Sequence, residues 1–140
     1  MKLVLDTDVI VAAMRSPTGA SAALLLAALE GKVTLVANVA LMFEYEATCM
    51  RAEHRLASGL SAIEVGIFLD AIVALAVPVE THYLWRPQLR DPGDEMVLEA
   101  AVNGIAQAIV TFNVRDYGVA PGRFGIKLLL PRDALKLPRG

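Results

Sequence analysis

The sequence predicts an α/β sandwich with a mainly parallel, roughly five-stranded sheet flanked by helices, and three observations lead to this class. The 140 residues suit one domain, residues 1–140, and 56% of them are apolar, which is enough for one buried core. Patterns typical of strands and of helices alternate along most of the chain. The strand patterns are continuous apolar runs, as expected for parallel strands covered on both faces.

The elements follow in order from these patterns. Strands are predicted at five short runs rich in Val, Ile and Leu: Lys2–Leu5, Val33–Ala37, Ala74–Val79, Ala108–Thr111 and Ile126–Leu130. Helices are predicted at four segments between them: Ala20–Glu30, Val39–Leu56, Ser61–Ala74 and Asp94–Val102. Asn38 is expected to cap the second of these helices, and Ser61 with Glu64 forms a capping box at the start of the third.

Composition excludes several classes of protein. A single cysteine, Cys49, leaves no internal disulfide and no zinc–thiolate cluster. Apolar runs such as Ala22–Leu29 are shorter than the roughly 18 residues that span a membrane, so no membrane association is expected. Neither glycine-rich phosphate-binding pattern occurs, which argues against a nucleotide cofactor. Asp6 interrupts the stretch where a signal peptide needs its apolar region, so the cytoplasm is the expected location.

Charge is distributed unevenly along the chain. Residues 1–112 carry 7 Lys and Arg against 13 Asp and Glu, a net charge of −6, whereas residues 113–140 carry 6 against 2, a net charge of +4. Such a skew is found on ordinary solvated surfaces. It is equally typical of a carboxylate cluster that binds cations beside a rim that attracts phosphates.

Polar side chains follow two of the predicted strands. Asp6 and Asp8 come directly after the first strand, and Asn113 and Asp116 follow the strand that ends at Thr111. Taken singly, each acid is expected to cap a helix or close a turn. If the two strands are neighbours, however, all these groups share one crevice at the carboxyl edge of the sheet.

Two further carboxylates are expected to join from helices. Glu44 lies at the edge of the apolar stripe formed by Leu41, Tyr45 and Cys49, whereas Glu46 lies farther toward the opposite face, so Glu44 is the better candidate. Asp94 shares a helical face with Val97 and Leu98, although a helix cap without chemistry is the competing interpretation for this residue.

Gathered carboxylates favour a divalent cation. Two carboxylates about 5 Å apart repel by roughly 3 kcal/mol at an effective dielectric near 20, so three or four in one cleft either take up protons or bind a divalent ion. Oxygen ligands without His or Cys favour Mg²⁺ or Mn²⁺ over zinc. With such an ion, a phosphodiester is hydrolysed without a protein nucleophile.

Four segments carry a resemblance to a known family. KLVLDTDVIVAA, FEYEATCMR, DPGDEMVLEAA and IVTFNVRDY resemble, in order and spacing, the motif blocks of the PIN-domain family, and within it the VapC-like toxins of type II toxin–antitoxin systems. The resemblance covers residues 1 to about 132 and implies a flavodoxin-like sheet, metal-dependent endoribonuclease activity, RNA as substrate, an antitoxin protein as partner and a homodimer.

The family's functional positions fall on particular residues of this sequence. The resemblance implies catalytic roles for Asp6, Glu44, Asp94 and Asp116, with Asp6 and Asp94 as metal ligands. Asp8, Thr111 and Asn113 are expected to support the site, and Arg115 is expected to contact RNA phosphates. Two departures concern the metal geometry: Asp8 stands where the family has Asn or Ser, and Asn113 stands where many members have Asp.

Other functions compete with this one. A catalytically weakened PIN-like module that binds RNA or protein is the main alternative, because of Asp8 and Asn113. The run LVLDTDVI also nearly matches the Asp-x-Asp motif of haloacid-dehalogenase-like phosphatases, but only 29 residues follow Thr111, with Asp116 and Asp133 as their only acids. A receiver domain would need an aspartate after its middle strand, where this chain has Glu80 and Thr81.

Overall fold

The computed structural model describes residues 1–81, 89 and 91–137 and shows the predicted α/β class. Five parallel strands form a sheet in the order β3-β2-β1-β4-β5. The strands are β1 Lys2–Leu5, β2 Thr34–Ala37, β3 Val77–Pro78, β4 Ala108–Val110 and β5 Lys127–Leu129. The helices are α1 Thr7–Arg15, α2 Ala20–Leu29, α3 Val39–Cys49, α4 Ala52–Ser58, α5 Ala62–Leu75, α6 Pro92–Asn103, α7 Val114–Tyr117 and α8 Pro131–Ala134, with a 3₁₀ turn, η1, at Pro121–Phe124.

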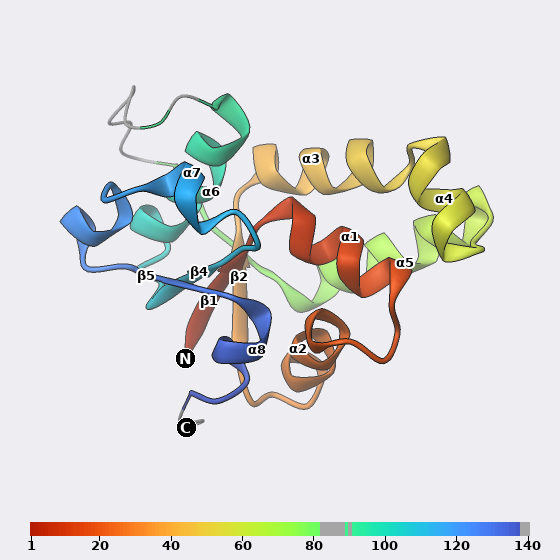
Figure 1. Cartoon of the computed structure of the whole chain (residues 1–140), viewed down its shortest axis with the longest axis horizontal. Helices are drawn as coiled ribbons and strands as arrows, with labels where there is room; N and C mark the ends of the chain where they lie inside the picture. The colour runs from red at the N-terminus through yellow and green to blue at the C-terminus, as the bar shows by residue number, and fades with distance from the viewer. Residues whose placement is uncertain (82–88, 90, 138–140) are drawn as a thin grey trace.

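Helices lie on both sides of this sheet, as expected for strands that are apolar along their whole length (Figure 1). The side chains of Leu3, Val4, Ile109 and Val110 in the two central strands are completely shielded from solvent. The predicted caps are present as well. Asn38 accepts from the backbone N–H of Leu41 at 2.8 Å, and Ser61 and Glu64 form the reciprocal capping box.

The helix α1 was not among the predicted elements. It begins directly after Asp6, and its buried face is formed by Val9, Ile10, Ala13 and Met14. This spacing is helical, although no helix is predicted between the first strand and Ala20. The consequence is that Asp8 lies in the first turn of a helix, rather than in a flexible connection.

The predicted helix Val39–Leu56 is in fact two helices. The backbone of Arg51 is extended, with φ −59° and ψ 139°, and separates α3 from α4. The apolar stripe that drives burial ends at Cys49, and α4 has no buried residue, so nothing in the core holds the two segments in one straight helix. The prediction of a strand at Ala74–Val79 was also too long, because α5 continues to Leu75 and pairing is limited to Val77–Pro78.

The strand order places a topological switch point between β1 and β4. The chain moves from β1 outward to β2 and β3, and then crosses back through α6 to β4 on the other side of β1. Because the connections on the two sides of β1 lie on opposite faces, a crevice opens beyond the carboxyl ends of these two strands. The backbone N–H of Asp6 donates to the carbonyl of Val110 at 2.9 Å, which brings the residues after β1 and β4 together.

Within the described residues, no single helix has both the length and the apolar character needed to cross a membrane; two helix pairs, bent by 99° and 91°, pass such a test only when each pair is taken together.

Candidate functional site at the carboxyl edge

Asp6 lies where β1 ends beside β4 and is almost completely buried. It is the N-cap of α1, with Oδ1 accepting from the backbone N–H of Thr7 at 2.7 Å. Its Oδ2 accepts from the hydroxyls of Thr111, at 2.8 Å, and Tyr117, at 3.1 Å. These three bonds occupy three of the roughly four acceptor positions of a carboxylate, so one remains for a further ligand.

Asp8 lies one residue into α1 and is held from the side of β4. Its Oδ2 accepts from the backbone N–H of Phe112 at 3.1 Å and from the side-chain amide of Asn113 at 3.0 Å. The other oxygen, Oδ1, is buried and has no hydrogen-bond partner among the described residues. Burial, followed by the charge of Asp6, raises the pKa of Asp8 to about 7.

Asp94 lies in the first turn of α6, and Asp91 shows whether Asp94 caps this helix. Asp91 is the N-cap of this helix and accepts from the backbone N–H of Gly93 at 2.7 Å, so the competing interpretation of Asp94 as the cap is wrong. Burial raises the pKa of Asp94 to about 6, with further contributions from Asp6, Asp91 and Asp116. The charges of three acids therefore act on Asp94: Asp6 after β1, Asp116 in α7 and the helix cap Asp91.

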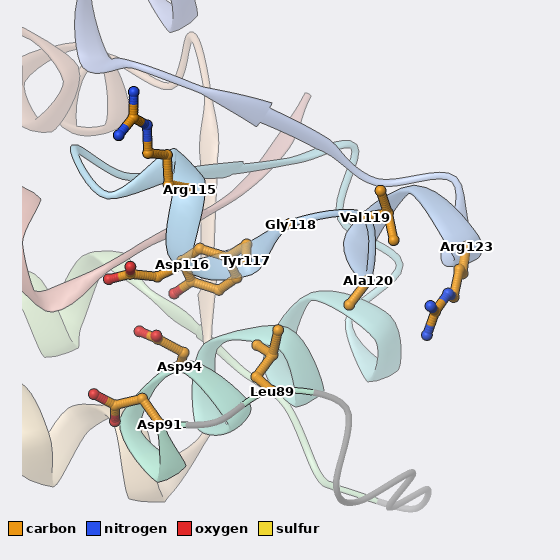
Figure 2. Close-up of a pocket in the computed structure, with 10 residues that line it drawn as sticks. All are labelled: Leu89, Asp91, Asp94, Arg115, Asp116, Tyr117, Gly118, Val119, Ala120 and Arg123. Atoms are coloured by element: carbon orange, nitrogen blue, oxygen red, sulfur yellow. The ribbon is translucent and has the colours of Figure 1, made fainter.

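The acids of α6 and α7 line one cleft of about 560 Å³. Figure 2 shows the carboxylates of Asp91, Asp94 and Asp116 directed toward the same side of this cleft. Arg115 also lines the cleft and is exposed, but its guanidinium points away from these acids (Figure 2). Asp94 and Asp116 thus line one cleft with Arg115 at its rim. Asp6 does not line this cleft and is linked to it through the hydroxyl of Tyr117.

Glu44 stands apart from this group. It is half-buried while Glu46 is exposed, in the sense expected from the helical face. Its Oε1 accepts from the hydroxyl of Thr48 at 3.2 Å, within the same helix. In the part of the chain that the structure describes, no hydrogen bond or ion pair joins Glu44 to Asp6, Asp94 or Asp116, so the geometry gives it no direct contact with the crevice.

Tyr117 is a site residue that the sequence interpretation missed. The ring is 1% exposed, and its hydroxyl donates to Asp6 and lies within hydrogen-bonding range of Asp94, whose pKa it lowers. Burial and the surrounding carboxylates raise the pKa of Tyr117 itself, so the phenol stays protonated and acts as a donor. The only signal in the sequence was its position directly after Asp116, in a segment that had no predicted helix.

Replacement of Tyr117 by Phe is expected to destabilise the protein by about 1–2 kcal/mol, since a buried bond to a carboxylate is lost while the ring still fills its space. Urea denaturation at pH 7 measures this change. Equal stability of Tyr117→Phe and the parent protein would show that Thr111 and Thr7 alone satisfy Asp6.

The arrangement fits a hard divalent cation in three respects. Its donor set consists of carboxylate oxygens, it holds a buried oxygen of Asp8 without a partner among the described residues, and burial and neighbouring acids raise the pKa of Asp8 and Asp94. Among the described residues, no three His, Cys, Asp or Glu side chains already lie in a geometry that holds a metal ion. A site with one or two carboxylates and several waters, the usual form for Mg²⁺, matches this arrangement better than a cage made of protein ligands.

The comparison with protein families agrees with the fold. A family model described as PIN domain matches residues 2–115, which is most of the chain and includes every acid described above except Asp116. Searches of curated proteins and of solved structures returned no match. PIN domains are generally nucleases and typically bind divalent metals. The parallel five-stranded sheet, the acids beyond β1 and β4 and the extent of the match together show that this chain belongs to the PIN-domain family.

Proposed function

We propose that this protein is a Mg²⁺- or Mn²⁺-dependent endoribonuclease that hydrolyses phosphodiester bonds of RNA. The observation that carries the proposal is the proximity of three acids from separate elements. Asp94 and Asp116 line one cleft, and the charges of Asp6 and Asp116 both raise the pKa of Asp94. Tyr117, in the wall of this cleft, donates to Asp6. Structural stability does not require such a cluster, because mutual repulsion of the acids weakens the fold. Three acids that destabilise one another are better explained by a cation and a phosphate substrate.

Asp6 and Asp94 are the proposed ligands, with Asp116 at the exposed side of the cleft. When bound, a divalent ion lowers the pKa of a water and stabilises charge on a leaving oxygen. The chain's own residues prepare this arrangement. Thr111 and Tyr117 hold one oxygen of Asp6 in place, and α1 holds the other. Asp91 caps α6, which leaves the carboxylate of Asp94 free to face the cleft.

The direct test is cleavage of a panel of single-stranded RNAs by the purified full chain, with Mg²⁺, with Mn²⁺ and with EDTA. Cleavage that requires the added ion supports the proposal. Binding of RNA without cleavage under every metal condition would favour the alternative, a PIN-like module that binds RNA or protein without cutting it. That alternative draws on the two departures from the family pattern, Asp8 and Asn113, which the structure joins by a hydrogen bond.

Glu44 and Glu46 provide a matched pair for the role of α3. Glu44→Gln is expected to lower metal-dependent cleavage about tenfold. The half-buried carboxylate of Glu44 contributes to the negative electrostatic potential of the crevice without touching the reacting groups. Glu46→Gln removes the same charge from an exposed position and is expected to leave cleavage within twofold. Initial rates on one RNA measure both variants, and equal rates would remove Glu44 from the site.

We further propose that Arg115 contacts RNA phosphates and that the protein is the toxin of a toxin–antitoxin pair. Arg115 is exposed at the rim of the acidic cleft and makes no ion pair within the described residues, so it is available to an anionic strand. The toxin role rests on the likeness of the four sequence segments to VapC-like proteins. It predicts a protein partner that inhibits cleavage when it is co-expressed with this chain.

Self-association is proposed on the basis of apolar surface. Large apolar side chains on α3, α4 and α5 are more than half exposed: Val39 62%, Phe43 67%, Leu56 83%, Ile63 79% and Ile67 64%. Apolar exposure on this scale is typical of an interface, and a second copy of the chain is the proposed occupant. Sedimentation velocity at micromolar concentration is expected to show a dimer, and a strictly monomeric species would contradict this proposal.

A further inference from the structure

A second cavity, of about 380 Å³, shares no lining residue with the acidic cleft. It is formed by the end of α1 and the start of α2, by the residue after Thr111, and by the start of α8, which packs against α2. In Figure 1, α8 lies beside α2 in the lower part of the view. Its lining consists of Ala12, Ser16, Gly19, Ala20, Ser21, Phe112, Leu130, Pro131 and Arg132. The function proposed above uses none of these side chains.

Ser21 is the first polar feature of this cavity. The residue is 3% exposed, and its hydroxyl has no hydrogen-bond partner among the described residues. A buried hydroxyl without a partner costs free energy. A ligand that forms a hydrogen bond with Ser21 would recover this free energy. Ser21 lies in the first turn of α2, a helix of ten residues whose N-cap, Gly19, offers no side-chain bond to the first N–H groups.

Arg132 and Phe112 complete the cavity. Arg132 is exposed and has no ion-pair partner in the described part of the chain. The ring of Phe112 is 49% exposed, although it lies only two residues after the buried strand β4. An exposed aromatic ring beside an unpaired guanidinium is a typical surface for an unstacked nucleobase, which stacks on the ring and bonds at its edge.

Two features connect the lining of this cavity to Asp8. Phe112 donates its backbone N–H to Asp8 at 3.1 Å. Ala12, in the wall of the cavity, lies four residues after Asp8 and therefore on the same face of α1, one helical turn away. An RNA strand whose phosphodiester lies at the acids is therefore expected to place a neighbouring nucleotide near this cavity.

We propose that this cavity binds guanine, through O6, or uracil, through O4, in single-stranded RNA next to the bond that the enzyme cuts. The inference rests on the proposed ribonuclease function. The first N–H groups of α2 and the guanidinium of Arg132 are donors, and no carboxylate lines the cavity. These donors match the acceptor oxygens guanine O6 and uracil O4. At the corresponding positions adenine N6 and cytosine N4 are amino donors, which find no carboxylate acceptor here.

The test is equilibrium binding of fluorescent single-stranded RNA pentamers to the full chain in EDTA, so that no strand is cut. Four pentamers carry G, U, A or C at the central position of one common sequence. The parent protein is expected to prefer the G and U strands about tenfold over the A and C strands. Arg132→Gln is expected to remove most of this preference, and Phe112→Ala is expected to weaken binding of all four strands about tenfold.

Matched variants separate the cavity from general charge and from folding. Lys136→Gln removes one positive charge from the same basic segment, at an exposed position outside the cavity, and is expected to keep the preference. Ser21→Ala removes the hydroxyl that has no partner. The melting temperature of this variant is expected to stay level or rise, while its preference for the G and U strands over the A and C strands becomes smaller. Equal binding of the four strands by the parent protein, or equal preference in Arg132→Gln and Lys136→Gln, would overturn the inference.

Failure of this inference and failure of the proposed function give different results. Metal-dependent cleavage without any base preference in binding would contradict the nucleobase inference and support the proposed ribonuclease function. Preferential binding of G and U strands without cleavage at any metal concentration supports the cavity on a non-cleaving RNA-binding protein.

Discussion

Replacement of Asp94 by Asn is expected to lower metal-dependent RNA cleavage by about 100-fold or more while the protein stays folded. The variant keeps the size of the side chain but removes the charge that a hard cation needs, and loss of one carboxylate ligand costs at least as much as the 10–100-fold typical of a residue that merely supports a ligand. Stability is expected to hold or rise, since the pKa of Asp94 is raised to about 6 by burial and neighbouring acids, so the charged form is the strained one in the absence of metal.

Asp91→Asn is the matched control for this variant. It removes the same charge from the same cleft, three residues earlier, but Asn retains the ability to cap α6. Its cleavage rate is expected to stay within about threefold of that of the parent protein. Rates at saturating Mg²⁺, with circular dichroism to verify folding, compare the two. Equal losses in both variants would show that the cleft requires negative charge in general rather than a ligand at Asp94.

The second large effect concerns Asp8 and the pH dependence of stability in the absence of metal. The folded protein raises the pKa of Asp8 from 3.8 to about 7, because the side chain is partly buried and lies beside Asp6. Between these values the folded state binds more protons than the unfolded state, so the free energy of unfolding falls as pH rises from 4 to 8. The full shift corresponds to about 4 kcal/mol, and partial exposure of Asp8 reduces the expected loss to about 2 kcal/mol.

Asp8→Asn is expected to remove most of this slope and to be more stable than the parent protein at pH 8, but not at pH 4. Urea denaturation in EDTA at pH 4, 6 and 8 measures the effect. The raised pKa of Asp94 acts in the same direction, so a smaller slope is expected to persist in the variant. Added Mg²⁺ is expected to stabilise the parent protein most at pH 8, where the acids are charged. A parent protein whose stability rises from pH 4 to pH 8 would contradict this account.

Asp6 shows why a carboxylate's role is difficult to assign from sequence alone. The sequence offered two interpretations, a helix cap or a member of a cation site, and the structure gives the residue both positions at once: its Oδ1 caps α1, and its Oδ2 faces Thr111 and Tyr117. Asp94 had the same two interpretations, but Asp91 takes the cap. The difference depends on where each helix begins, and helix boundaries are the least certain part of a pattern-based prediction.

The sequence by itself determined the fold class, the strands of the central sheet and the acids that follow them. Continuous apolar runs such as Lys2–Leu5 have no polar face to expose, so they require cover on both sides, and chemistry is confined to their ends. Tertiary structure decided which of these ends meet. The crossing through α6 makes β4 the neighbour of β1, and this places Tyr117 against Asp6, 111 positions earlier in the chain, while Glu44 is left in contact with its own helix. Local patterns carry no information about such contacts, because they arise from the order in which the strands pack.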